Sequence, residues 1–417
     1  MYIKELTKEE FDKFTNKFQI KSIYQTSQYG NLMLNQGFEN LYIGLFDEDR
    51  LIGGSLILIK KVSKFKYAYA PRGFLIDYNN SRLLYDFTKL VKHYLSKLGV
   101  VGIKINPLVL KTIYDFKNQT STHNPYYDKI YKDLRDFDYY HLGYNNFFEA
   151  LKPRFEGIIE LNKSTDVLFK DIKKEYRTKI RSAIKNGVKV YKGNISTLDK
   201  LYEFTKDRYV RDLNYYKDCY GYFINDNMID IFCTKLNAKQ YLEVTQQKLS
   251  HYESQSYYFN KKIQTNNASQ KLITKKINND KLIELYKNQL INATNLLRNN
   301  PEEIITSVCI VIKQDKEATI LIDGYDKAYK KLNSKHLLIW ELIETYKKQG
   351  FERLNLGGMS NIIVDSKRYT GLNQFKLNFG CKMYEYAGDF ELVTNKINYS
   401  LYRNYIPIKQ KIIDKLK

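Results

Sequence analysis

A row of cationic side chains is the feature of this sequence with the most direct chemical meaning. Five cations recur within residues 166–187, at Lys170, Lys174, Arg177, Arg181 and Lys185. Lys and Arg side chains that neutralise phosphates supply most of the non-specific affinity of proteins for nucleic acids. The formal net charge of +22 likewise favours a polyanionic partner, either a nucleic acid or an anionic membrane face. In a chain this rich in Lys, a solvated helix face is the competing interpretation.

Residue patterns typical of several other chemistries are absent from the sequence. The four cysteines are scattered, with no Cys-x-x-Cys pair and no His at metal-ligand spacing, so we expect neither a metal site nor a disulfide framework. A Gly-x-Ser-x-Gly nucleophile motif is also missing. The apolar runs are too short to cross a bilayer, and the N-terminal residues lack the apolar core of a signal peptide. We therefore expect a cytoplasmic protein.

A helix is needed to hold the cationic row. An apolar stripe at helical spacing runs through the same segment and consists of Phe169, Ile172, Tyr176, Ile180 and Ala183. At 3.6 residues per turn, the cations fall on a second stripe roughly 120° away. Gly187 is expected to end the helix before a strand at 188–192. The pattern predicts one packed face and one outward row of cations.

Two segments of the chain share one order of predicted elements. An apolar hairpin at 42–59, a helix ending at Gly99 and a strand at 101–105 form the first segment. A hairpin at 307–323, a helix ending at Gly350 and a strand at 352–356 form the second. A hairpin, a helix and a returning strand are typical of a mixed α/β sheet. The repetition predicts two similar α/β lobes.

A long polar segment separates the cationic helix from the second hairpin. No glycine occurs between Gly221 and Gly324, although the segment is rich in Lys, Gln and Asn. Apolar residues recur there at close to heptad spacing, first at Leu242, Leu249, Tyr252, Phe259 and Ile263, then at Ile283, Tyr286, Leu290, Ala293 and Leu297. A disordered linker would not maintain this spacing. We predict two antiparallel helices that project as a hairpin arm.

Several motifs along the chain resemble those of one known family. The run Arg177-Thr-Lys-Ile-Arg-Ser-Ala-Ile-Lys-Asn-Gly-Val-Lys-Val190 resembles its basic helix and strand. Further resemblances lie in Tyr69-Ala-Pro-Arg-Gly-Phe-Leu-Ile-Asp77, Lys152-Pro-Arg-Phe and Leu337-Leu-Ile-Trp-Glu-Leu-Ile. Gly371-Leu-Asn-Gln-Phe-Lys-Leu-Asn-Phe-Gly380 is similar to its most specific motif, Gly-Leu-x-x-Phe-Lys-x-x-Phe-Gly. Together these motifs resemble the Fem family, the aminoacyl-tRNA-dependent transferases that build peptidoglycan interpeptide bridges.

The resemblance implies an α/β (α+β) fold of two N-acetyltransferase-like lobes with an inserted antiparallel coiled-coil arm. The expected divisions are 1–150 for the first lobe, 151–230 with 300–395 for the second, 231–299 for the arm, and 396–417 for a basic C-terminal helix packed on the lobes. The implied partners are aminoacyl-tRNA and a lipid-linked or UDP-linked peptidoglycan precursor. Contact with the inner membrane face and association with copies or related transferases are also implied. No cofactor is expected, because aminoacyl-tRNA is the co-substrate.

The implied reaction is aminolysis of an activated ester, in which the acceptor amine of the stem peptide is itself the nucleophile. The enzyme must then orient the substrates and stabilise the developing oxyanion. The resemblance assigns the oxyanion role to Lys376, with Phe375 beside it. It assigns substrate binding to Tyr29, Arg72, Asn106, Arg208, Gly357 and Gly358, and tRNA binding to the cationic row. A structural ion pair at Arg72, an exposed helix arginine at Arg208 and a simple turn at the two glycines are the alternatives.

The chain departs from the family pattern at several positions. Tyr29 stands where a Trp is usual, and Met33 stands where a phosphate-contacting Lys is common. Asn106 and Asn355 replace Asp, and Ile320–Ile322 replace aromatic residues. These differences concern acceptor binding rather than Phe375 and Lys376.

Two other functions compete with this interpretation. An acetyl-CoA-dependent acetyltransferase would need a glycine-containing pyrophosphate loop near Lys331–His336, and no glycine occurs there. A non-enzymatic RNA-binding protein would fit the charge and the arm but not the lobe repeat. Transfer between charged tRNA and a precursor amine is therefore the predicted function.

Overall fold

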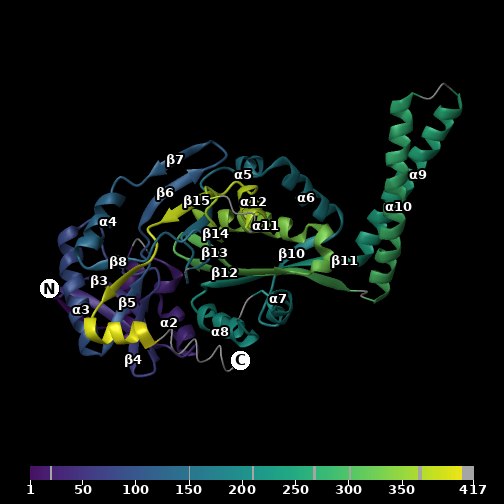
Figure 1. The fold of residues 1–417 in the computed structure, drawn as a ribbon. Helices are drawn as coiled ribbons and strands as arrows, with labels where there is room; N and C mark the ends of the chain where they lie inside the picture. The colour runs from purple at the N-terminus through teal and green to yellow at the C-terminus, as the bar shows by residue number, and fades with distance from the viewer. Residues whose placement is uncertain are drawn as a thin grey trace.

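Two mixed β-sheets form the body of the protein in a computed structural model (Figure 1), which describes residues 1–18, 21–149, 151–208, 211–265, 269–299, 302–364 and 369–405. The first sheet has the order β1 (Tyr2–Glu5), β2 (Glu39–Asp47), β3 (Arg50–Val62), β4 (Phe65–Ala70), β5 (Val100–Ile105), β16 (Phe390–Val393) and β8 (Tyr139–His141). The second sheet has the order β10 (Val188–Lys192), β11 (Ile229–Asn237), β12 (Glu303–Gln314), β13 (Glu317–Tyr325), β14 (Arg353–Met359), β9 (Phe155–Glu160), β15 (Lys382–Tyr386), β6 (Leu110–Asp115) and β7 (Thr120–His123).

The two sheets repeat one strand pattern. Each has one parallel pair, β4 with β5 in the first and β13 with β14 in the second, and the other neighbours pair antiparallel. When the parallel pairs are matched, β2 corresponds to β11 and β3 corresponds to β12. The predicted match between the hairpins at 42–59 and 307–323 was therefore wrong by one strand. The arm replaces the turn of the β11–β12 hairpin, at the place where β2 and β3 are joined by a short turn.

The helices cover both sheets. They are α1 (Lys8–Lys17), η1 (Ile23–Gln25), α2 (Ser27–Leu34), α3 (Ser81–Lys97), α4 (Tyr127–Asp136), α5 (Thr165–Asp171), α6 (Lys174–Lys185), α7 (Thr197–Thr205), α8 (Leu213–Ile224), α9 (Ala238–Thr265), α10 (Gln270–Asn299), η2 (Lys327–Leu332), α11 (Ser334–Lys348) and α12 (Thr370–Leu377). Local capping fixes several starts, as where the Asn80 side chain accepts from the Leu83 amide at the start of α3.

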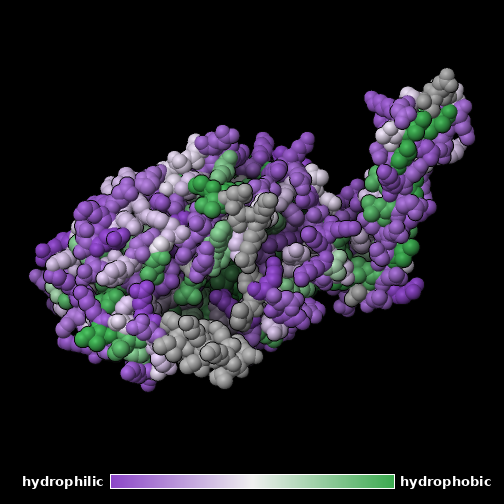
Figure 2. Space-filling model, in the orientation of Figure 1, coloured by the Kyte–Doolittle hydropathy of each residue, from purple (hydrophilic) through white to green (hydrophobic). Residues whose placement is uncertain are grey.

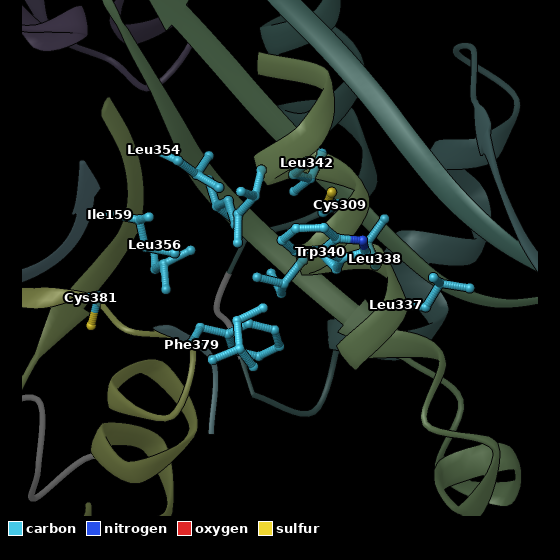
Figure 3. Close-up of a cluster of buried hydrophobic side chains, with 14 of the residues drawn as sticks. Ile159, Cys309, Leu337, Leu338, Trp340, Leu342, Leu354, Leu356, Phe379 and Cys381 are labelled. Carbon is cyan, nitrogen blue, oxygen red and sulfur yellow. The ribbon is translucent and has the colours of Figure 1, made fainter. Parts of the chain in front are cut away.

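The second sheet carries helices on two faces because its strands are apolar on both sides. Cys309, Val311 and Ala318 point into a core with α6, α11 and α12, part of which is drawn in Figure 3. Val308 and Ile310, at alternate positions of β12, point into another core formed with α2, α7 and α8. Because helices pack on both of its faces, the second sheet separates two hydrophobic cores. A separate core lies under α3 and α4 on the first sheet.

The arm consists of α9 and α10, which pack along each other and project from the body (Figure 1). Tyr252 stacks on Tyr286 at 5.3 Å between ring centroids, and the Asn279 amide donates to the Tyr252 carbonyl over 2.9 Å. The ten predicted seam positions are buried or half-buried. Figure 2 shows apolar side chains along the arm among hydrophilic ones. The mixed α/β fold with an inserted helical arm is thus confirmed.

The expected domain limits are wrong at three places: the start of the arm, residues 110–123, and β16. Residues 231–237, assigned to the arm, belong to β11, so the arm begins at Ala238. Residues 110–123, assigned to the first lobe, form β6 and β7 in the second sheet, whereas β16 completes the first sheet. At the C-terminus, 396–405 is helical and Tyr402 stacks on Tyr67 of β4. The rest of the predicted C-terminal helix lies outside the described residues.

Candidate active site

A cavity of about 660 Å³ lies between the two lobes. First-lobe segments, the residues leading into β9, and the strands β13 and β14 all contribute to its walls. Among its charged and aromatic lining residues are Lys21, Tyr24, Arg72, Lys152, Glu156, Arg211, Glu317, Arg353, Tyr384 and Tyr386. A cavity of this volume can hold a small polar ligand, or part of a larger one.

The parallel strands β13 and β14 separate at the wall of this cavity. They pair only from Glu317–Arg353 to Thr319–Asn355, after which Ile320–Ile322 and Gly357–Gly358 line the cavity. Gly357 has a φ of +80°, a conformation that glycine adopts without strain. A Cβ on Gly358 would come within 2.8 Å of Phe148. The backbone conformation therefore favours glycine at position 357, and close packing favours glycine at position 358.

Lys376 of α12 lies directly behind the two glycines. Its Nζ donates to the Gly358 carbonyl over 2.6 Å, and it would be 3.8 Å from a Cβ on Gly357. The side chain is only 8% exposed. Burial is the main cause that lowers the pKa of Lys376 to about 8, although Asp323 opposes it. A buried ammonium group is thus held at the edge of the cavity, where it can donate a further hydrogen bond.

Arg72 forms a buried network that reaches the strand carrying the two glycines. Its Nη2 pairs with Glu156 Oε1 at 2.5 Å and donates to the Pro153 carbonyl over 2.8 Å. The other Glu156 oxygen accepts from the Asn355 amide over 2.8 Å. Arg72 has a φ of +52°, and its backbone N–H donates to Asn106 Oδ1 over 2.8 Å. Arg72 lines the cavity as predicted, whereas Asn106 is 2% exposed and supports the Arg72 backbone.

Tyr29 lies behind the cavity wall rather than on it. Its ring packs edge-on against Tyr24 at 5.1 Å, and Tyr24 lines the cavity. Gln25 fixes this segment, because its buried amide donates to the carbonyls of Leu56 and Pro71 and accepts from the Leu56 amide. The predicted role of Tyr29 in substrate binding is therefore indirect, through Tyr24.

Lys152, Arg211 and Glu156 are among the lining residues that were not predicted as site residues. Lys152 is 7% exposed, and its Nζ lies 3.2 Å from the centroid of the Tyr24 ring. Arg211 precedes α8, and Glu156 is on β9. A sequence signal existed for Lys152 and Arg211, since Lys152 opens the Lys-Pro-Arg motif and Arg211 follows Arg208 by three residues. Nothing local marked Glu156.

Arg208 and Phe375 do not line the cavity. Arg208 follows α7 and is exposed. Burial raises the pKa of Asp323, but its ion pair with Lys335 at 2.5 Å, together with smaller effects that include Arg208, outweighs burial and lowers the pKa. Phe375 joins an aromatic cluster with Tyr176 and His336, at 5.9 and 5.4 Å between ring centroids. The cluster joins α6, α11 and α12, so Phe375 positions the helix that carries Lys376.

The cationic row is divided between two helices. The predicted single helix breaks at Ile172–Lys173, so Lys170 lies on α5 while Lys174, Arg177, Arg181 and Lys185 lie on α6. The Lys173 amide donates to the Asn378 carbonyl over 2.9 Å, which holds the break against α12. Lys174, Arg181 and Lys185 are exposed, but Arg177 is half-buried. Tyr176, Ile180 and Ala183 face the core as predicted.

A second cavity of about 670 Å³ adjoins the first. Arg72, Leu108 and Leu110 line both, and Asp77 lines the second. Within the described ranges, no three His, Cys, Asp or Glu side chains are arranged to hold a metal ion. None of the helices in that part of the chain has both the length and the apolar character of a membrane span.

Comparisons with known proteins give a consistent picture. A family model described as the FemAB family matches residues 6–405. The chain is 24% identical to the aminoacyltransferase FemA of Staphylococcus epidermidis, over 97% of this chain and 99% of that protein. It is 24% identical to the lipid II:glycine glycyltransferase of the same species, over 99% and 98%. The crystal structure of FemX has a TM-score of 0.73 at 21% identity, over 96% of this chain and 99% of that one, a likeness of fold.

Proposed function

Because this chain belongs to the FemAB family, we propose that it is an aminoacyltransferase that extends peptidoglycan interpeptide bridges. The donor is charged tRNA, and the acceptor is a free amine on the stem peptide of a lipid-linked or nucleotide-linked precursor. The relatives named aminoacyltransferase FemA and lipid II:glycine glycyltransferase, which align along almost the whole chain, support this proposal.

The reaction is aminolysis of the aminoacyl ester. The acceptor nitrogen attacks the ester carbonyl carbon, the C–N bond forms, and the C–O bond to the tRNA ribose breaks. The amine loses a proton and the ribose oxygen gains one. Negative charge develops on the carbonyl oxygen before the C–O bond breaks, so a positioned cationic donor lowers the barrier most effectively at that atom.

The position of Lys376 is the observation that carries the proposal. Its ammonium group is buried, is bonded to the Gly358 carbonyl and lies close to Gly357, and both glycines line the cavity. In a poorly solvated site such a charge interacts more strongly than it would in water. An ester carbonyl lying over Gly357 would place its oxygen within reach of the remaining N–H groups of Lys376.

The two substrates reach the cavity from opposite sides of the second sheet in this proposal. The row on α6 holds the tRNA backbone, on the face that also carries α11 and α12. The precursor enters from the face that carries α2, α7 and α8. The separated strands β13 and β14 let the reacting groups meet. Peripheral contact with an anionic membrane and association with related transferases remain parts of the proposal.

A donor competition tests this function. Purified protein is incubated with the precursor and either tRNA charged with labelled Gly, Ala or Ser, or labelled acetyl-CoA. We expect label to move to the precursor from at least one charged tRNA and not from acetyl-CoA. Transfer from acetyl-CoA alone would contradict the proposal and favour an ordinary acetyltransferase.

A further inference from the structure

A helix at residues 396–405 lies on the first sheet and carries two apolar side chains on its outward face. Ile397 is 77% exposed, and Leu401, one turn later on the same face, is 50% exposed. This helix is drawn in yellow at the lower left of Figure 1, and hydrophobic side chains lie at the same place in Figure 2. Neither residue belongs to one of the three hydrophobic cores. Exposed apolar side chains that are grouped on one helix face indicate a contact surface.

Aromatic residues hold the opposite face of this helix against the sheet. Tyr402 stacks on Tyr67 of β4 at 5.1 Å between ring centroids. The Tyr399 hydroxyl donates to Glu391 of β16, which also accepts from the Tyr67 hydroxyl. Because Tyr399 and Tyr402 face the sheet, the two apolar side chains are directed away from it. The folded body therefore keeps them at its surface.

Cations surround this outward face. The helix ends beside the β3–β4 turn, where Tyr405 and Phe65 lie 6.3 Å apart between ring centroids. Residues 60–66 at that turn and the helix itself contain no Asp or Glu. They contain six cations, which are Lys60, Lys61, Lys64, Lys66, Lys396 and Arg403. Within the described ranges, only one of the six forms an ion pair, Lys66 with Glu39 at 3.2 Å.

Three exposed cations border the apolar pair. Arg403 is on the helix itself. Lys60 lies opposite Tyr67 across the β3–β4 pair, on the side of the sheet that the helix covers. Lys64 is in the turn at which the helix ends. We call the following residues the basic-apolar surface: Lys60, Lys64, Ile397, Leu401 and Arg403.

We propose that the basic-apolar surface binds an anionic lipid bilayer. Ile397 and Leu401 enter the boundary between headgroups and acyl chains, and the three cations lie at the lipid phosphates. Apolar burial and electrostatic attraction together are the usual basis of peripheral binding to such bilayers. The inference rests on the proposed function, in which a lipid-linked acceptor brings the enzyme to a membrane, and it names the surface that makes the contact.

The exposed apolar pair favours a bilayer over a nucleic acid as the partner. A phosphate backbone attracts the cations, but it offers no apolar region to cover Ile397 and Leu401. The surface also lies at the opposite end of the body from α6, which carries the proposed tRNA-binding row (Figure 1). A molecule bound to a bilayer by the basic-apolar surface therefore leaves α6 open to tRNA.

Flotation of the full-length protein with vesicles tests this surface directly. We expect wild-type protein to float with vesicles rich in phosphatidylglycerol and not with phosphatidylcholine alone, and added salt to weaken the binding. Replacement of Lys60, Lys64 and Arg403 by Gln should weaken binding roughly tenfold or more. Ile397→Ser together with Leu401→Ser should weaken it roughly fivefold or more, although all charges are kept.

Two control variants separate this surface from general electrostatic attraction. Lys60→Arg together with Lys64→Arg keeps the charges and should keep the binding within a few-fold. Replacement of Lys174, Arg181 and Lys185 of α6 by Gln removes as many exposed cations and should leave vesicle binding unchanged. The variants of the basic-apolar surface should bind tRNA as the wild type does. All substituted positions are exposed, and thermal melts check that each variant is folded.

The outcomes separate this inference from the proposed function, because flotation needs neither charged tRNA nor precursor. Absence of wild-type binding, equal binding by the surface variants, or an equal loss in the α6 variant would overturn the inference. Weaker tRNA binding with unchanged vesicle binding would assign the surface to RNA and overturn it as well. Failure of the wild type to transfer an aminoacyl group to the soluble UDP-linked precursor would contradict the proposed function instead.

Discussion

At the scale of single residues, the proposed catalysis depends on a lysine that is charged although it is buried. Lys376 keeps one hydrogen bond to a backbone carbonyl and has two further N–H groups for a substrate. Its pKa of about 8 leaves most of the molecules protonated at neutral pH, yet close to a pH at which the charge is lost. This proximity makes the role testable by titration.

Lys376→Met should reduce transfer by roughly 10²-fold or more, the usual cost of removing one oxyanion donor. In wild-type protein the Lys376-dependent rate should be full below a pH of about 8 and fall as the pH rises through that value, because only the ammonium form donates. Single-turnover rates across pH check both statements. A decline of the same size and midpoint in Lys376→Met would assign the titration to another group.

Glu156→Ala should destabilise the protein by about 3–5 kcal/mol, because it leaves the buried Arg72 without a counter-charge. Urea unfolding measures the free energy. Ion pairs at the surface contribute much less to the free energy of unfolding. Glu39→Ala, which removes an exposed carboxylate paired with Lys66, is therefore the control. Equal effects of the two substitutions would show that the Arg72 network is not a buried structural element.

Short sequence motifs identified site residues whose type could be recognised from the residues next to them in the sequence. Lys376, Gly357, Gly358 and Arg72 were predicted, and the fold brings them to one cavity or its edge. Lys152 was not predicted as a site residue, because its contact with Tyr29 joins positions 123 residues apart. The Lys-Pro-Arg motif marked the segment, but the burial of Lys152 against Tyr29 depends on how distant parts of the chain pack, for which no local pattern exists.

At the scale of elements, the break between α5 and α6 decides which cations can act together. It was not predictable, because the apolar period continues through Ile172 while the break is stabilised from outside the segment. Asp171 pairs with Lys117 and Lys163, and Lys173 bonds to Asn378. The tRNA-binding row in the proposal is therefore α6, with Lys170 apart from it.

Charge reversal of Lys174, Arg181 and Lys185 should weaken tRNA binding and flatten its dependence on salt concentration by up to about three phosphate contacts. Reversal of Lys64, Lys89 and Lys97, exposed cations of the first lobe, is the matched control. Binding isotherms over a range of salt concentrations measure both effects. Equal effects of the two triple variants would favour a solvated face on α6 and general electrostatic attraction.

At the scale of the whole molecule, the two lobes are joined by exchanged strands and not by a simple linker. β6 and β7 extend the second sheet although they follow β5 of the first, and β16 returns to the first sheet after β15 of the second. The two-lobed fold was predictable from the repeated elements, but the exchange was not, since β6 pairs with a strand more than 260 residues away. The exchanged strands therefore link the two lobes that line the cavity.

Removal of the distal arm, residues 253–282, with a short turn in its place, should leave the body folded. The retained part keeps the Tyr252–Tyr286 stack and the bond from Lys248 to Asn186. The removed helix turns contact mainly each other, so we expect the melting temperature of the body to change by only a few degrees. A thermal melt measures this temperature. Loss of cooperative unfolding in the shortened protein would show that the distal arm is needed for the stability of the body.

The mass of the acceptor after incubation with charged tRNA shows whether this protein transfers an aminoacyl group with the help of Lys376. We predict that wild-type protein adds one aminoacyl residue to the precursor, that the added mass survives mild base, as an amide does and an ester does not, and that Lys376→Met of equal stability adds little in the same time. A base-labile product, or equal yields from wild-type and Lys376→Met protein, would contradict the account.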